Sequence, residues 1–252
     1  MKKNSILFVL VFVVFCSFVL VKEKQTTVYL IGDSTIANKD VKAYPETGWG
    51  MPFSGFFDSS VVVDNRAKNG RSTRTFIEEG LWKPVIENLQ QGDYVFIQFG
   101  HNDEVETKKS FTIKEQFTAN LAKYVTETRA KKGLPVLLTP VARRRFDSSG
   151  RIVGTHDVYS ELVRGVAKQM NVPLIDLDKK SQAMLQDLGV EGSKLLFNHL
   201  VPGEHPNYPD GKTDDTHFSE LGARKMATLV LAEIRQLKLD LASRIYAPAK
   251  KN

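Results

Sequence analysis

Residues 29–38 read "YLIGDSTIAN", in which a short apolar run stops abruptly at Gly32-Asp33-Ser34. A short apolar run of this kind is typical of a strand in a parallel sheet that is covered on both faces. In open parallel sheets, ligands bind beyond the carboxyl ends of the strands. The stretch therefore predicts a buried strand that ends by presenting Ser34 at the edge of a sheet.

The rest of the chain alternates short apolar runs with amphipathic segments of helical length, which predicts an α/β fold with a parallel sheet. A length of 252 residues suits one such domain. Strands are expected at residues 28–31, 61–64, 94–99, 135–139 and 173–175. Helices are expected at residues 113–128, 158–169 and 220–239.

Two further local patterns accompany these elements. Thr112-x-x-Glu115 matches a capping box at the start of the first expected helix. Residues 188–215 form the one long irregular segment, rich in glycine, proline, asparagine and histidine, and loops of that length are usually functional or mobile.

Residues 1–25 stand apart from the remainder. Lys2 and Lys3 precede an apolar run over residues 6–21, which is the pattern of a secretory signal peptide. An uncleaved N-terminal anchor, or a lipid anchor at Cys16, is the alternative. We therefore expect residues 26–252 to form the folded domain of a secreted or periplasmic protein, or of one anchored at the cell envelope.

Composition excludes several classes of function. Cys16 is the only cysteine, so the domain has no disulfides, zinc–cysteine sites or thiol catalysis. The formal net charge of +6 falls by half without the leader, and the basic residues are too scattered to indicate nucleic-acid binding. An acidic polymer would suit such a surface.

A serine at a strand end can act as a nucleophile if a histidine takes its proton and a carboxylate orients that histidine. Asp214 lies three residues before His217, so its carboxylate can reach Nδ1 while Nε2 faces outward. Asp215 is the alternative orienting acid. The pattern predicts Ser34, His217 and Asp214 as a catalytic set.

Acyl transfer also needs hydrogen-bond donors aimed at the developing oxyanion. The N–H groups of Ser34 and Gly70 and the side-chain amide of Asn102 are the expected donors, since each follows a predicted strand. Asp33 is expected to hold the turn by accepting backbone hydrogen bonds. His101 is expected to be a structural neighbour of the site.

These residues carry a resemblance to a known family. Four blocks resemble, in order, those of the SGNH (GDSL-type) hydrolase superfamily: Gly32-Asp33-Ser34-Thr35, Asn69-Gly70, Gly100-His101-Asn102-Asp103 and Asp214-x-x-His217. Five longer stretches are similar to the rhamnogalacturonan acetylesterases within it: "IGDST", "NRAKNGRSTRTF", "FGHND", "TPVARRRF" and "PDGKTDDTHFSELGA".

The resemblance implies a flavodoxin-like three-layer α/β/α sandwich with a five-stranded parallel sheet. It also implies a serine esterase that removes O-acetyl groups from pectic polysaccharide through an acyl-enzyme, without a metal or other cofactor. The implied roles are nucleophile for Ser34, base for His217 and orienting acid for Asp214. Ser34, Gly70 and Asn102 would form the oxyanion hole.

Basic residues surround the expected site. Arg71 and Arg74 follow Gly70, and Arg143 follows the fourth expected strand. Such a rim would suit the carboxylates of galacturonate, and a solvated charge run is the alternative reading. The histidines of the 199–217 segment lack the spacing of a metal site, so no metal is expected.

Other functions remain open at this point. Within enzymes, the alternatives are an acetylesterase of another O-acetylated glycan such as xylan, and a lipase-like esterase of longer acyl chains. From another class, the alternative is a carbohydrate-binding protein without turnover. The expected partner is acetylated pectic polysaccharide, with no nucleic acid, no membrane contact beyond an uncleaved leader, and a monomeric state.

Overall fold

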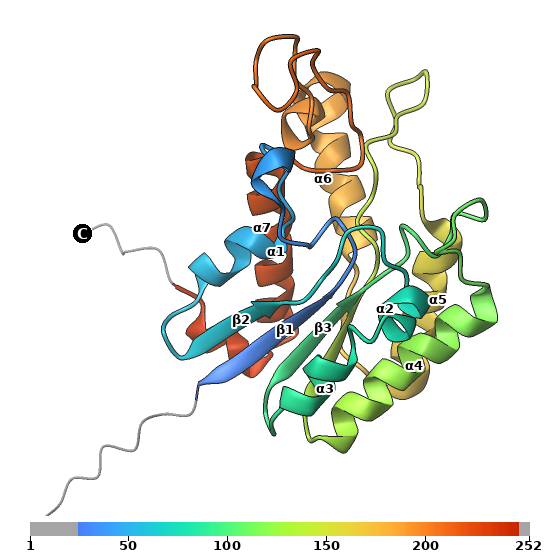
Figure 1. The fold of residues 1–252 in the computed structure, drawn as a ribbon, viewed down its shortest axis with the longest axis vertical. Coiled ribbons are helices and arrows are strands. Elements are labelled where there is room, and N and C mark those ends of the chain that lie inside the picture. Colours follow the sequence, from blue (N-terminus) through green and yellow to red (C-terminus); the bar gives the residue numbers. More distant parts are fainter. Residues whose placement is uncertain (1–24, 247–252) are drawn as a thin grey trace, which may run out of the picture.

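The structure is a computed structural model and describes residues 25–246 (Figure 1). The leader predicted for residues 1–25 lies, apart from Gln25, outside the described residues. Five strands form one parallel sheet in the order β2-β1-β3-β4-β5, which confirms the predicted fold class. The strands are β1 (Thr26–Gly32), β2 (Val61–Asn65), β3 (Tyr94–Gln98), β4 (Leu134–Leu138) and β5 (Leu174–Ile175).

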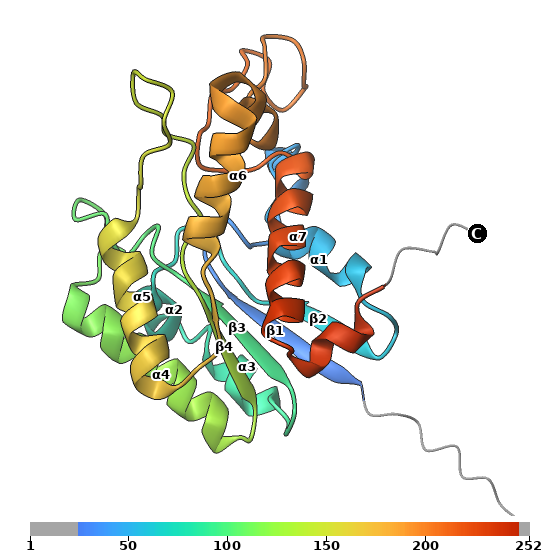
Figure 2. The same ribbon diagram turned by 180° about the vertical axis from the view of Figure 1, so that it is seen from behind.

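Helices cover both faces of the sheet (Figures 1 and 2). One face is covered by α1 (Gly50–Phe53), α6 (Leu177–Gly192) and α7 (Glu220–Gln236). The other is covered by α2 (Thr73–Glu78), α3 (Lys83–Asn88), α4 (Lys114–Ala130) and α5 (Asp157–Met170). Short 3-10 turns complete the connections at η1 (Val41–Ala43), η2 (Ser54–Phe56), η3 (Ser193–Leu196) and η4 (Asp240–Arg244).

The middle of strand β1 is apolar because its side chains pack into two hydrophobic cores. Val28 and Leu30 pack into the core under α1, α6 and α7, whereas Tyr29 and Ile31 pack into the core under α2 to α5. Each such side chain contributes roughly 1.5–3 kcal/mol when it is fully buried. Burial on alternating sides therefore fixes the register of β1 in the sheet.

Two local predictions were wrong. Helix α4 begins at Lys114 with Ile113 as N-cap, and the hydroxyl of Thr112 donates to the carbonyl of Ser110 at 3.2 Å instead of capping the helix. The irregular segment expected from residue 188 starts later, because α6 and η3 continue to Leu196. Gly189, at φ 68°, interrupts α6 there and accounts for the misleading glycine signal.

The remaining helix predictions for residues 158–169 and 220–239 correspond to α5 and α7. Nowhere in residues 25–246 does a helix combine the length and apolar character that crossing a bilayer requires.

The strand order places the crevice of the sheet between β1 and β3. The chain passes from β1 outward to β2 and then returns across β1 to β3, so the connections leave these two strands toward opposite faces. Ser34 follows β1 and Asn102 follows β3. The topology alone therefore brings the two loops side by side.

Buried carboxylates anchor these loops. Asp33 accepts hydrogen bonds from the N–H and hydroxyl of Thr35, at 2.9 and 2.8 Å, as expected for a residue that holds the turn. Asp103 accepts from the N–H and hydroxyl of Thr73, the first residue of α2, at 2.9 and 2.6 Å. Asp103 thus ties the loop after β3 to the loop that carries Gly70.

We expect Gly222→Ala in α7 to destabilise the protein by roughly 1–3 kcal/mol through overpacking. A Cβ at Gly222 would lie 1.8 Å from the carbonyl oxygen of Leu196. Gly165→Ala in α5 is the matched control, since a Cβ there meets nothing within 4 Å. It should stabilise by roughly 0.5–1 kcal/mol. Urea unfolding of both variants checks this, and equal effects would contradict the packing described.

We expect Asp103 to make stability depend on pH. Burial raises the pKa of this carboxyl to about 7, whereas in the unfolded chain the carboxyl ionises near its ordinary value of 3.8. Between these values the folded state holds one proton more, so stability falls as pH rises and levels off above 7. The loss amounts to roughly 4 kcal/mol.

The comparison is with Asp103→Asn, which keeps an acceptor for Thr73 and cannot ionise. Urea unfolding at several pH values between 4 and 8 should show the wild type losing stability relative to the variant as pH rises. Parallel curves for the two proteins would show that Asp103 does not titrate in this window.

Candidate active site

A chain of hydrogen bonds links Ser34, His217 and Asp214. Ser34 Oγ lies 2.9 Å from Nε2 of His217, and Nδ1 of His217 lies 2.9 Å from Oδ2 of Asp214. An ionised carboxylate only accepts hydrogen bonds, so Nδ1 carries the proton and Nε2 accepts from the serine hydroxyl. The structure thus brings together the three residues predicted as a catalytic set.

Asp214 holds the turn as well as the imidazole. Its Oδ1 accepts from the N–H groups of Thr216 and His217, at 2.8 and 2.9 Å. Partial burial alone would raise the pKa of Asp214, but the hydrogen bonds from His217 and Thr216 outweigh it and hold the pKa well below its ordinary value. Asp214 therefore stays ionised opposite the histidine.

Asp215, the alternative orienting acid, points elsewhere. Its Oδ1 lies 2.8 Å from Nε2 of His199 and 2.9 Å from Nη1 of Arg144. The geometry therefore separates the two neighbouring acids, which the sequence left open.

Ser34 opens into a cavity of about 370 Å³ that also contains the predicted oxyanion donors. Gly70 has φ 77°, a conformation that favours glycine, and its N–H has no backbone acceptor within residues 25–246. The side-chain nitrogen of Asn102 donates to the carbonyl of Arg71 at 3.1 Å, which leaves its second N–H for a ligand. The cavity is lined by Ser34, Glu46, Asn69, Gly70, His101, Asn102, Lys108, Arg143, Thr216 and His217.

His101 also lines this cavity. Its ring packs against that of His156, with centroids 4.1 Å apart. Burial lowers the pKa of His101 well below its ordinary value, so the ring is neutral. This agrees with the structural role expected for His101.

The three arginines predicted to bind substrate all have partners within the protein. Arg71 pairs with Glu79 at 2.8 Å and donates to the carbonyl of Asn69 at 2.8 Å. Arg74 pairs with Glu78 at 2.6 Å. Neither of these two arginines lines the Ser34 cavity.

Arg143, in contrast, does line the cavity. It donates to the hydroxyl of Thr216 at 2.7 Å and lies 3.6 Å from the carboxylate of Glu104. It therefore braces the residue before His217 from the loop after β4.

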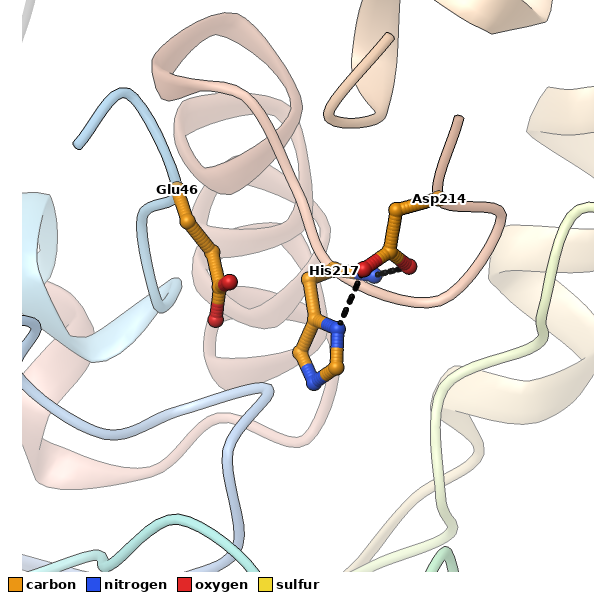
Figure 3. A group of neighbouring side chains, drawn as sticks. All are labelled: Glu46, Asp214 and His217. Atoms are coloured by element: carbon orange, nitrogen blue, oxygen red, sulfur yellow. Dashed lines mark hydrogen bonds and ion pairs between the residues drawn. The ribbon is translucent and has the colours of Figure 1, made fainter. Parts of the chain in front are cut away.

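One group of potential metal ligands lies at the site. Glu46, Asp214 and His217 place one donor atom each within 4.8 Å of one another (Figure 3). Both ring nitrogens of His217 are already engaged, one with Asp214 and the other with Ser34. This donor set fits proton transfer better than cation binding, and the expectation of a metal-free site stays a prediction.

Sequence reasoning missed Lys39, Glu46 and Lys108. The side chain of Lys39 is fully buried, and its Nζ donates hydrogen bonds to the carbonyl oxygen of Ser34 and to Oδ1 of Asn69. Glu46 and Lys108 line the cavity. No motif marks these positions, because what they share is proximity in the fold and not spacing along the chain.

The geometry supports nucleophilic acyl transfer. A hydroxyl within hydrogen-bond distance of an imidazole that an ionised carboxylate orients is the arrangement that activates a serine. Ser34, Gly70 and Asn102, whose N–H groups are the expected oxyanion donors, all line the same cavity.

Comparisons with known proteins agree with this geometry. Residues 30–225 match the GDSL-like Lipase/Acylhydrolase family. The chain is 42% identical to the rhamnogalacturonan acetylesterase RhgT of Bacillus subtilis over 89% of its own length and 96% of that protein. It is 32% identical to the probable rhamnogalacturonan acetylesterase YesY of the same organism, over 86% of this chain and 96% of that protein.

Solved structures show the same fold. The Bacillus subtilis protein YxiM superposes with a TM-score of 0.73 at 25% identity, over 86% of this chain, which spans 58% of that protein. The acetylxylan esterase Axe2 of Geobacillus stearothermophilus superposes with a TM-score of 0.60 at 20% identity, over 84% of this chain and 96% of that protein. On the family match and on both acetylesterase relatives, this chain belongs to the GDSL-like lipase/acylhydrolase family, as its sequence blocks indicated.

Proposed function

We propose that this protein is a serine esterase that removes O-acetyl groups from rhamnogalacturonan through an acetyl-enzyme on Ser34. The observation that carries the proposal is the continuous hydrogen-bond chain from Ser34 through His217 to Asp214. The 42% identity to a rhamnogalacturonan acetylesterase over most of both chains supports the substrate.

In the first half-reaction, Ser34 Oγ attacks the acetyl carbonyl carbon while Nε2 of His217 takes the hydroxyl proton. The oxyanion that forms accepts hydrogen bonds from Ser34, Gly70 and Asn102, where loss of one donor typically costs about 3 kcal/mol. The bond to the sugar oxygen then breaks, and His217 returns its proton to that oxygen. The sugar hydroxyl leaves and the acetyl group stays on Ser34.

In the second half-reaction, His217 takes a proton from water, and the hydroxide so formed attacks the acetyl carbonyl carbon. The bond from that carbon to Ser34 Oγ then breaks, Nε2 of His217 returns its proton to Ser34 Oγ, and acetate leaves. Asp214 remains ionised throughout, since its pKa is held well below the ordinary value, and it stabilises the imidazolium at both stages. The histidine thus ends in the state in which it began.

The charge of the cavity suits an acidic polymer. Lys108 lines the cavity, and its Nζ lies 3.4 Å from Oδ1 of Asn102. In the described part of the chain no carboxylate pairs with this ammonium, unlike Arg71, Arg74 and Arg143. Lys108 is therefore the cation that we propose to meet a galacturonate carboxylate.

A polymeric pectic substrate also fits export of the protein. The basic and apolar pattern of residues 1–25 supports a location outside the cytoplasm. We propose that the enzyme acts there, as a secreted, periplasmic or envelope-anchored protein.

We expect Ser34→Ala and His217→Ala each to lower kcat by at least about 10⁴-fold, because they remove the nucleophile and the base. Asp214→Asn should lower kcat by about 10³-fold or more. Asp215→Asn is the matched control and should retain activity within a few-fold, because Asp215 faces His199. The measurement is acetate release from acetylated rhamnogalacturonan, with circular dichroism to verify folding. Equal losses for the two aspartate variants would contradict the assignment of Asp214.

We expect Lys108→Ala to raise KM for acetylated rhamnogalacturonan about 10-fold and to affect para-nitrophenyl acetate hydrolysis far less, since only the polymer carries carboxylates. Lys109→Ala is the control, because Lys109 is exposed next to Lys108 and does not line the cavity. Hydrolysis of acetylated xylan, a neutral polymer, should be unaffected by either substitution. If the wild type released acetate faster from acetylated xylan than from acetylated rhamnogalacturonan, the proposed substrate would be wrong.

A further inference from the structure

A buried lysine lies directly behind the nucleophile. The side chain of Lys39 is 0% exposed, and its ammonium donates to Ser34 O at 2.5 Å and to Asn69 Oδ1 at 3.0 Å. Its third partner is Glu46 Oε1, at 2.7 Å. An ammonium has three N–H donors, so every one of them has an acceptor. Burying a charge is costly unless it is paired and hydrogen-bonded, and here both conditions hold.

The two neutral partners of Lys39 belong to the chain segments that supply the main-chain oxyanion donors. The N–H of Ser34 is one of the proposed oxyanion donors, and Lys39 donates a hydrogen bond to the carbonyl oxygen of the same residue. Asn69 precedes Gly70, so the Gly70 N–H belongs to the peptide group that Asn69 begins. Lys39 therefore links the loop after β1 to the loop after β2 at the point where both face the substrate.

The Asn69–Gly70 peptide is held from two directions. Lys39 binds the side chain of Asn69, while Nη1 of Arg71 donates to the carbonyl oxygen of Asn69 at 2.8 Å. In a trans peptide the N–H points away from the carbonyl oxygen. Because Arg71 fixes that oxygen and Lys39 fixes the side chain, the direction of the Gly70 N–H is set before any substrate binds.

Glu46 completes the arrangement on the side of the histidine. Its carboxylate lines the Ser34 cavity, has a side chain only 13% exposed, and places an oxygen within 4.8 Å of donor atoms of His217 and Asp214. Figure 3 shows Glu46 and Asp214 reaching toward the His217 ring from opposite sides. Lys39 compensates the charge of Glu46, so the histidine is flanked by a second carboxylate that is already neutralised.

We propose that Lys39 and Glu46 are positioning residues of the active site, in which Lys39 fixes the Ser34 and Gly70 oxyanion donors relative to each other and Glu46 holds Lys39 in place. This inference rests on the proposed esterase function. Neither residue transfers a proton or touches the acetyl group. Their contribution is made in the transition state, where the oxyanion has formed, and not in the binding of the ground-state ester.

The test compares Lys39→Met, which keeps the length of the side chain and removes its donors, with Lys42→Met, an exposed lysine on η1 that has no ion pair among the described residues. We expect Lys39→Met to lower kcat for both para-nitrophenyl acetate and acetylated rhamnogalacturonan by about 10–100-fold with little change in KM. Lys42→Met should match the wild type. Glu46→Gln, which keeps an acceptor for Lys39, should give a smaller loss of kcat than Lys39→Met.

A second measurement distinguishes the proposed positioning role of Lys39 from a purely structural one. A small boronic acid forms a tetrahedral adduct with a serine hydroxyl, so its inhibition constant reports the oxyanion hole. We expect Lys39→Met to weaken boronic-acid inhibition by about the same factor as kcat. A lower melting temperature with unchanged kcat and unchanged boronic-acid inhibition would overturn the inference.

Lys39→Met leaves Glu46 as an unpaired, largely buried charge and so endangers folding. The double variant Lys39→Met/Glu46→Gln removes both charges, and its kcat should be as low as that of Lys39→Met. A double variant with wild-type kcat would overturn the inference. Failure of the proposed esterase function would give a different result from failure of this inference. In that case Ser34→Ala would hydrolyse the same esters as fast as the wild type.

Discussion

The adjacency of β1 and β3 in the sheet is the constraint on which the rest of the structure depends. Since the chain goes out to β2 and returns across β1 to β3, the loops after these strands leave toward opposite faces and open a crevice between them. Ser34 and Asn102 stand at this crevice because each directly follows its strand. His217 reaches it from the other end of the sequence, on the segment that leads into α7. The strand order thus brings the loops after β1 and β3 together, and the segment before α7 adds the histidine to them.

The loops around the site are held in place by hydrogen bonds from polar side chains that are buried beneath them. Asp33 holds the turn after β1, and Asp103 ties the loop after β3 to the start of α2. Lys39 joins the loops after β1 and β2 through three hydrogen-bonded oxygens. Each bond is made before substrate arrives, so the donors do not have to reorganise when the oxyanion forms, and this preorganisation is the principal source of electrostatic stabilisation in acyl transfer.

The sequence predicted those features that depend on local pattern or on motif. The five strands, the class of fold and the family were confirmed, because short apolar runs and the blocks around Ser34, Gly70, Asn102 and His217 carry them. The capping box at Thr112 and the start of the irregular segment were wrong, because tertiary contacts and the turn at Gly189 overrode local signals. The Lys39–Glu46 pair could not be predicted, since a buried lysine differs from a solvated one only in its surroundings. The ion-pair partners of Arg71, Arg74 and Arg143 could not be predicted either. These partners, Glu79, Glu78 and Glu104, depend on the folded arrangement of the chain.

The central claim is that Ser34 carries the acetyl group between the two half-reactions, and trapping that intermediate tests it most directly. The enzyme would be mixed with excess para-nitrophenyl acetate, quenched in acid within the first turnovers, digested, and analysed by mass spectrometry. The account predicts one acetyl group on the peptide that contains Ser34, and none on that peptide in Ser34→Ala. Turnover that leaves the Ser34 peptide unmodified while another residue carries the acetyl group would contradict it.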